Sequence, residues 1–148
     1  MQDYPAITEL LPHRGPAVLL DTVLEDTPDK IRARARIGAD HPYFVAGRGV
    51  PAWVGIELMA QAAAAHAGLK ARLSQKPPNA GMLLGTRRFE ALEPWFREGM
   101  ELEVVAEQEF GATGEGGVSA CVCSIYSGGR TLATATLVVL EIIEGMKP

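Results

Sequence analysis

One long apolar run, GVPAWVGIELMAQAAAAHAGL from Gly49 to Leu69, constrains the fold of this chain most. Its Ala, Leu and Met residues favour a helix, and Pro51 stands near the start, where a helix tolerates proline. The run is apolar around nearly the whole helical wheel, which is typical of a fully buried helix or a membrane span. Glu57, Gln61 and His66 argue against a span, because a carboxyl near its middle costs about 2.5–3.5 kcal/mol. We therefore predict a non-membrane protein folded around one central helix.

Glu57 is the first candidate functional residue. At about 100° per residue, Gln61 and Trp53 lie about 40° to either side of it, and His66 lies about 180° away. A carboxyl in a mostly apolar helix must be neutral, paired or facing a polar cavity. Two interpretations stay open: a buried glutamate that is hydrogen-bonded for structure, or an acid kept protonated by desolvation at a pocket.

Composition narrows the classes of function. The 148 residues suit one domain over residues 1–148, and the net charge of −4 disfavours nucleic acid or an anionic membrane as a general partner. The first residues show no cationic region followed by an apolar stretch, so we expect no signal peptide. Cys121 and Cys123 are two residues apart on one strand face and poorly placed to bridge each other, which indicates reduced thiols and a cytoplasmic protein. Nothing near them completes a metal-ligand set, so we expect no metal.

The segments before the central helix predict a short helix, two strands and a loop. A helix is expected within residues 5–11, and the dense apolar run AVLLDTVL predicts a strand over residues 17–24. Residues 30–37 alternate strictly, with Ile and Ala on one face and Lys and Arg on the other, so they predict a strand with a solvated basic face. The loop over residues 38–50 contains His41, Gly47 and Gly49, and glycines that lead into a helix leave backbone N–H groups free for a carbonyl oxygen or a phosphate.

The pattern of the second half of the chain predicts strands. Residues 74–81 form a Pro-rich linker and residues 111–117 a Gly-rich flexible turn. Strands are expected over residues 82–91, 100–110, 118–126 and 132–143, and Gly128-Gly129 predicts a tight hairpin between the last two. The expected fold class is α+β: an antiparallel sheet wrapped around one long central helix, the hotdog architecture.

Three segments together resemble the hotdog-fold 3-hydroxyacyl-acyl-carrier-protein dehydratases of fatty acid synthesis. LLPHR from Leu10 with AVLLD from Ala17 resembles the family opening L-L-P-H-R-x-P-x-L-L-V-D. GIELMAQA from Gly55 is similar to its helix motif E-A-M-A-Q-A, and LGTRRF from Leu84 to its A-G-I-x-x-A-R-F strand. The run VPAWVGIE from Val50 most resembles a divergent branch of dehydratase-like proteins linked to aryl polyene pigments.

The resemblance implies a mechanism and partners. A His removes the α-proton of a 3-hydroxyacyl thioester, an acid on the central helix protonates the departing hydroxyl, and backbone N–H groups at the helix entrance hold the thioester oxygen. Glu57 matches the family acid, with Gln61 one turn later, while Trp53, Tyr43 and Gly49 are the further substrate-binding candidates. The substrate is tethered through phosphopantetheine to an acyl carrier protein. No cofactor is implied, and the active site is shared across a dimer.

The helix entrance departs from the family pattern. Counting back from Glu57 without gaps, the position of the family His falls on Tyr43, and His41 lies two residues too early. A loop two residues longer would still deliver His41 as the base. The alternatives are that HPYF matches the E-P-F-F segment before the family His, so that the catalytic His is missing, or that His41 only caps backbone groups in the loop. His13 matches a family position that is usually structural.

Three functions therefore remain for the chain. A dehydratase needs His41 and Glu57, a thioesterase can use Glu57 and water alone, and a degenerate subunit would pair with an active dehydratase in a heterodimer instead of forming a homodimer. Exposed arginines at positions 87, 88 and 97 are candidates for docking the acidic carrier protein. The family topology would also place the basic strand of residues 30–36 beside the acidic row of residues 101–109, so that opposite charges pair.

Overall fold

The computed structural model describes residues 3–75, 80–109 and 118–142. The elements within these ranges follow in the order α1 (Ile7–Leu10), η1 (Gly15–Ala17), β1 (Thr22–Asp26), β2 (Lys30–Arg36), β3 (Val50–Pro51), η2 (Ala52–Val54), α2 (Gly55–Leu73), β4 (Ala80–Ala91), β5 (Trp95–Phe96), β6 (Glu101–Gln108), β7 (Val118–Ser127) and β8 (Arg130–Ile142), where η marks a 3-10 helix.

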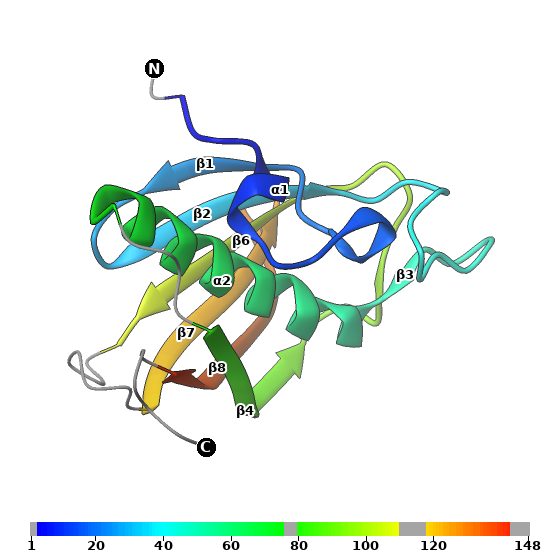
Figure 1. Ribbon diagram of the computed structural model, residues 1–148. Coiled ribbons are helices and arrows are strands. Elements are labelled where there is room, and N and C mark those ends of the chain that lie inside the picture. The colour runs from blue at the N-terminus through cyan, green and yellow to red at the C-terminus, as the bar shows by residue number, and fades with distance from the viewer. Residues whose placement is uncertain (1–2, 76–79, 110–117, 143–148) are drawn as a thin grey trace.

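An antiparallel sheet curves around α2. The strands lie in the order β1-β2-β6-β7-β8-β4, and β3 pairs separately with β5 just before α2 begins. In Figure 1 this sheet curves behind α2, and α1 with the neighbouring N-terminal segment lies against the helix from its other side. The expected α+β hotdog architecture is confirmed.

The central helix owes its apolar sequence to being covered by these two layers. Leu58, Met59 and Ala62 of α2 are fully buried in the same core as Ile31 of β2 and Val104 of β6. The helix continues to Leu73, four residues beyond the apolar run, because Lys70 and Arg72 are good helix formers and suit the negative end of the helix dipole. Among the described residues, no helix has both the length and the apolarity needed to cross a membrane.

The opposite charge rows pair as expected. Strand β2 lies antiparallel to β6, with Lys30 opposite Glu107 and Arg36 opposite Glu101. Ion pairs join Arg32 to Glu103 and, at 3.8 Å, Arg34 to Glu101. Both rows are thus explained within the sheet, and the basic face of β2 needs no nucleic-acid partner.

The strand predicted over residues 17–24 is wrong in its first half. Ala17 closes η1, and pairing of β1 with β2 starts only at Thr22. Leu19 and Leu20 are nonetheless buried, and the side chain of Gln61 on α2 bonds the backbone at Ala17 and Leu19. This segment is apolar because it lies in the core. The Gln61 amide makes the hydrogen bonds to its backbone that a neighbouring strand would otherwise make.

The last hairpin is confirmed. Gly128 and Gly129 form a two-residue turn between β7 and β8 with φ of 58° and 77°, as the mirror-image hairpin turn requires. The central residues of the expected linker, 76–79, and the expected turn at residues 111–117 lie outside the described residues, as do Phe110 and Ile143 at the ends of two predicted strands.

A buried hydrogen-bonded pair lies on the face of α2 that points away from Glu57. His66 Nδ1 is 2.6 Å from Asp26 Oδ1 at the end of β1, and both side chains are almost fully buried. The backbone N–H of Asp26 donates to the hydroxyl of Tyr4 at 2.9 Å. The pair thus ties the later turns of α2 to β1 and to the N-terminal segment, far from the helix entrance.

Gly68 lets α1 approach α2 closely, which yields a stability prediction. A Cβ at this position would lie 2.7 Å from the carbonyl oxygen of Leu10. We expect Gly68→Ala to lower the free energy of unfolding by about 1–3 kcal/mol, as overpacking does, although the same change in an exposed helix raises it by about 1 kcal/mol. Urea denaturation measures the difference.

The exposed neighbour Ala67 supplies the control for this prediction. Ala67→Gly should cost about 1 kcal/mol through helix propensity alone. A Gly68→Ala variant that is more stable than the unmodified protein would contradict the close packing of α1 on α2.

Candidate functional site

Glu57 lies in the first turn of α2, where two side chains hold one of its oxygens. Gln61 Nε2 donates to Glu57 Oε1 at 3.0 Å. His13 Nε2 lies 3.1 Å from the same Oε1. The Glu57 side chain is 43% exposed, so the carboxyl is anchored on one side and open on the other. This is a geometry in which the second oxygen can meet a ligand.

Gln61 is fully buried and uses its whole amide inside the chain. Its Oε1 accepts the N–H of Leu19 at 2.9 Å, and its Nε2 donates to the carbonyl of Ala17 at 2.7 Å as well as to Glu57. The bond from Leu19 settles which end of the amide is oxygen, because only an oxygen can accept it. The structure thus gives Gln61 a supporting place behind Glu57, and direct contact with a substrate stays a prediction.

His41 lies in the loop between β2 and β3 and is partly buried. The N–H of Tyr43 donates to His41 Nδ1 at 3.1 Å, and Nε2 is buried without a hydrogen-bond partner among the described residues. Burial lowers the pKa of His41, and the nearby carboxylates of Asp40 and Asp21 oppose this shift. The imidazole is therefore neutral at pH 7, with its proton on Nε2 in this conformation.

Within one chain, the structure does not bring His41 and Glu57 together. No hydrogen bond or ion pair between described residues joins them, and the charges that act on His41 are those of Asp40 and Asp21. The residue that meets Glu57 is His13, which sequence reasoning assigned a structural place. No spacing signal could have found it, because His13 lies 44 residues before Glu57 and reaches it only through the fold.

Two exposed aromatic rings stand at the entrance of α2. Tyr43 packs edge-on against Trp53 with ring centroids 5.6 Å apart. The two residues are 44% and 59% exposed, respectively. Two adjacent apolar rings on a surface are a candidate contact for a ligand or a partner. Their role as substrate contacts remains a prediction.

Gly49 has a backbone role at this entrance. Its φ is 111°, and a Cβ would lie 2.2 Å from the carbonyl oxygen of Phe96, so no other residue fits. Its N–H donates to Val45 O, and the N–H of Ala52 donates to Pro94 O. The first N–H left without such a partner among the described residues is that of Trp53, in the turn that opens the helix. It is the candidate donor for a thioester oxygen.

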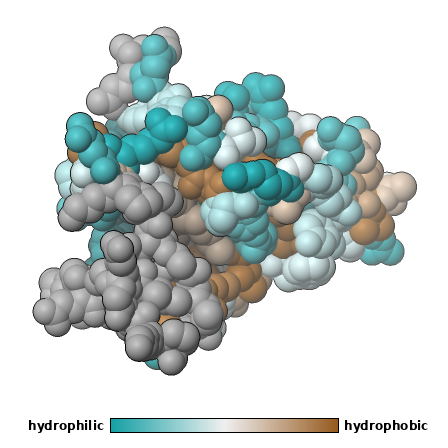
Figure 2. Space-filling view, in the orientation of Figure 1, coloured by the Kyte–Doolittle hydropathy of each residue, from teal (hydrophilic) through white to brown (hydrophobic). Residues whose placement is uncertain are grey.

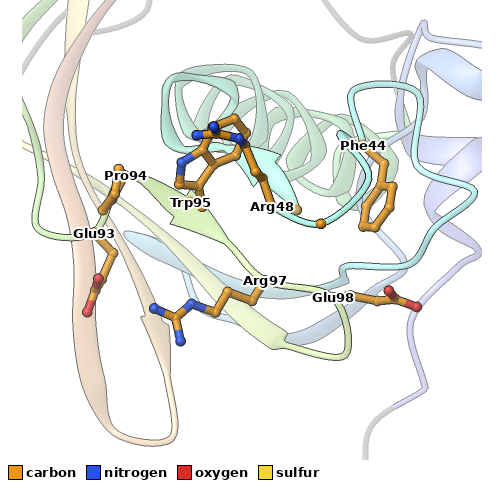
Figure 3. A pocket seen from close by; sticks show the side chains of 9 residues that line it. Phe44, Arg48, Glu93, Pro94, Trp95, Arg97 and Glu98 are labelled. Atoms are coloured by element: carbon orange, nitrogen blue, oxygen red, sulfur yellow. The ribbon is translucent and has the colours of Figure 1, made fainter.

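A surface cleft of about 760 Å³ lies beside the glycine loop. Arg48 lies over the ring of Trp95, as Figure 3 shows. Its guanidinium carbon is 5.5 Å from the ring centroid. The other lining residues are Phe44, Gly47, Gly49, Glu93, Pro94, Arg97 and Glu98. The cleft thus combines aromatic surface with two arginines and two glutamates, Glu93 and Glu98. Its formal side-chain charges balance, so the lining does not favour one charge of ligand.

The two cysteines are unsuited to nucleophilic chemistry. Both are free, and Cys123 is buried. Burial raises the pKa of each thiol, so both remain protonated at neutral pH. The chemistry of the site therefore depends on the carboxyl and imidazole groups.

The fold and the carboxyl on its central helix define a hotdog-fold protein. A family model described as "ApeP-like: ApeP dehydratase" matches residues 5–146, so the chain belongs to the ApeP-like dehydratase family. No curated protein sequence matches it.

Solved structures agree with this fold. The dehydratase heterocomplex ApeI:P from Xenorhabdus doucetiae is similar with a TM-score of 0.87 and 24% identity, over 96% of this chain and 94% of that one. The PaaI protein of the phenylacetic acid degradation operon of E. coli has a TM-score of 0.60 and 14% identity, over 80% and 81%. A hypothetical thioesterase with coenzyme A from Streptococcus pneumoniae has a TM-score of 0.58 and 11% identity, over 81% and 84%.

The lowered pKa of His41 predicts a pH-dependent stability. The unfolded chain, with an ordinary His pKa of about 6.5, binds the proton more readily than the folded chain does. The stability that neutral His41 contributes is therefore present above pH 6.5 and is lost as the pH falls below about that value. We expect His41→Gln, which keeps an acceptor for the Tyr43 N–H, to lose less stability between pH 7 and pH 5.

Urea denaturation of both proteins across this range measures the effect. His66 is present in both proteins, so its own response to pH cancels in the comparison. Parallel pH dependence in the two proteins would contradict a neutral, desolvated His41.

Proposed function

We propose that this chain is a subunit of a 3-hydroxyacyl-[acyl-carrier-protein] dehydratase and that Glu57 is its acid. The anchored, half-exposed carboxyl at the entrance of α2 carries the proposal, since it belongs to a chain of the ApeP-like dehydratase family. Glu57 protonates the departing β-hydroxyl while a base removes the α-proton, so that water leaves and a carbon–carbon double bond forms. The acyl chains in question are fatty acyl or polyene thioesters, including those of aryl polyene pigments.

The base comes from across a subunit interface in this proposal. A neutral His41 with its Nδ1 occupied and no contact to Glu57 does not complete the site within one chain. A related hotdog subunit would supply the imidazole that faces Glu57, and His41 of this chain is the candidate base for the second site. The assembly of a similar protein as the dehydratase heterocomplex ApeI:P supports a heterodimer of this kind.

The surface of α2 supports a partner subunit. Ile56, Ala60, Ala63 and Ala64 form one helical stripe that is only partly buried. Figure 2 shows apolar surface between polar residues on the face that α2 presents in Figure 1. Covering this stripe and the Tyr43–Trp53 pair would bury apolar surface and close an acyl-binding tunnel.

The second candidate function is thioester hydrolysis. It needs only a carboxylate and water, and Glu57 is held without any His base other than His13 nearby. The similar hypothetical thioesterase with coenzyme A is compatible with this reading of the fold. Either activity would act in the cytoplasm, where Cys121 and Cys123 remain thiols.

Replacement of Glu57 tests the proposal directly. The complex of this chain with its related hotdog subunit is incubated with a 3-hydroxyacyl carrier-protein thioester, and mass spectrometry follows the acyl group. We expect loss of one water, and we expect Glu57→Gln to lower kcat by about 100- to 10,000-fold, the usual contribution of a general acid. His41→Ala in the same assay reports whether this chain also supplies a base.

Glu25→Gln is the matched control, because Glu25 is an exposed carboxylate of β1 whose ion-pair partner among the described residues is Arg32. It should keep full turnover. Release of free acid that is lost in Glu57→Gln but kept in His41→Ala would show that the chain acts as a thioesterase and not as a dehydratase. Full turnover by Glu57→Gln would contradict both the dehydratase and the thioesterase function.

Carrier docking is a separate prediction. Arg87, Arg88 and Arg97 are exposed, and no ion pair among the described residues involves them. Attraction between these arginines and the acidic carrier protein should speed association. We expect the double variant Arg87→Glu and Arg88→Glu to weaken carrier binding at least tenfold, since tenfold corresponds to about 1.4 kcal/mol.

Titration of the acylated carrier protein at low and high salt measures this effect. Arg72→Glu, at the far end of α2 and paired with Glu9, is the control for a charge reversal away from these arginines. Equal affinity of the double variant and the unmodified complex would rule out this arginine pair as the docking site.

A further inference from the structure

The segment that carries His13 is fixed on both sides. Before it, Leu10 and Leu11 are buried in the core. After it, the Gln61 amide bonds the backbone of Ala17 and Leu19. A side chain held this firmly can act as a fixed point for a neighbouring group.

Arg14 adds a local clamp to the same segment. One nitrogen of its guanidinium, Nη1, lies 3.0, 3.3 and 2.8 Å from the carbonyl oxygens of Leu11, Pro12 and His13, which share its two N–H groups. These contacts to a single atom hold the backbone of residues 11–13 in a curve. The imidazole is thereby aimed at α2 by its own neighbours in the sequence.

The state of the His13 imidazole follows from its two nitrogens. Nε2 lies 3.1 Å from Glu57 Oε1. Nδ1 is buried and has no hydrogen-bond partner among the described residues. A buried N–H without an acceptor is costlier than a buried lone pair, so the neutral imidazole favours the tautomer with Nδ1 bare and its N–H on Nε2, the nitrogen that faces Glu57.

Two side chains then converge on one oxygen of Glu57. Gln61 Nε2 donates to Oε1 and His13 Nε2 lies 3.1 Å from the same atom, while no hydrogen bond between described residues involves Oε2. In the acid form, Oε1 is the carbonyl-like oxygen that faces both side chains, and the transferable proton sits on Oε2. One contact alone would let the carboxyl plane turn about it, whereas two contacts fix the plane.

We propose that His13 is a positioning residue that, together with Gln61, turns Glu57 Oε2 toward the substrate. This rests on the proposed role of Glu57 as the acid. In the step, the Oε2–H proton goes to the β-hydroxyl, which leaves as water, and the electron pair of the α-C–H bond forms the double bond as the base takes that proton. His13 gains and loses nothing; it keeps the carboxyl in place.

Three variants of His13 test the proposal in the complex with the partner subunit. A Gln side chain places its amide nitrogen near the position of Nε2, while Asn places it near Nδ1, too short to reach Glu57. We expect His13→Ala and His13→Asn to lower kcat by about ten- to a hundredfold with KM little changed, because a misplacement of about 1 Å costs on the order of a hundredfold. His13→Gln should recover most of that loss.

Crystal structures of the same variants give a readout that does not depend on turnover. Glu57 should occupy more than one rotamer in His13→Ala and His13→Asn, and a single one in His13→Gln. An ordered, unmoved Glu57 in His13→Ala overturns the proposal, whatever the activity. If the unmodified complex does not dehydrate its substrate, the proposed function fails while the rotamers still decide the positioning role.

His66→Gln separates positioning from general destabilisation. This change removes a buried His on the opposite face of α2 and should lower the melting temperature through the lost pair with Asp26. It should leave the Glu57 rotamer and kcat as they are. A loss of kcat in His66→Gln equal to that in His13→Ala would show that both act only through stability, and would overturn the proposal.

Discussion

The Gln61 amide is the interaction on which the site depends. It accepts from Leu19, donates to Ala17 and donates to Glu57, all from a fully buried position. A net hydrogen bond contributes about 1 kcal/mol, but a buried partner left unsatisfied costs about 1–3 kcal/mol. One side chain therefore fixes both the N-terminal segment against α2 and the carboxyl that faces outward. The structural and the chemical roles of this residue cannot be separated, because the same amide nitrogen serves both.

Much of the fold was predictable because its causes are local or periodic. The apolar run predicted a largely buried central helix, the alternating charges predicted neighbouring strands, and the Gly128-Gly129 pair predicted a hairpin. The error over residues 17–24 has a different cause. An apolar run reports burial, and burial can be achieved by a segment whose backbone is bonded by a side chain from a helix.

The site was predictable only in part. Glu57 stood out because a carboxyl in an apolar helix needs a reason to be there. His13 did not, because its contact with Glu57 is set by how α1 packs on α2 and by the Arg14 clamp, neither of which has a period or a spacing. His41 was attractive by position in the sequence, yet its electrostatic neighbours are Asp40 and Asp21. Sequence motifs identify candidate residues, whereas the tertiary structure determines which of their side chains are in contact.

The open oxygen of Glu57 explains why one fold can serve two reactions. A carboxyl held through Oε1, with Oε2 free, can give a proton to a leaving hydroxyl or, when ionised, take one from water. Nothing on the anchored side distinguishes these tasks. The choice lies with the opposite wall of the tunnel: an imidazole from a partner subunit permits removal of an α-proton and elimination, whereas an ordered water in its place leads to hydrolysis. His41 of this chain accepts a hydrogen bond from its own loop. Under the proposed function, a partner that covers α2 would therefore determine the reaction as well as the shape of the tunnel.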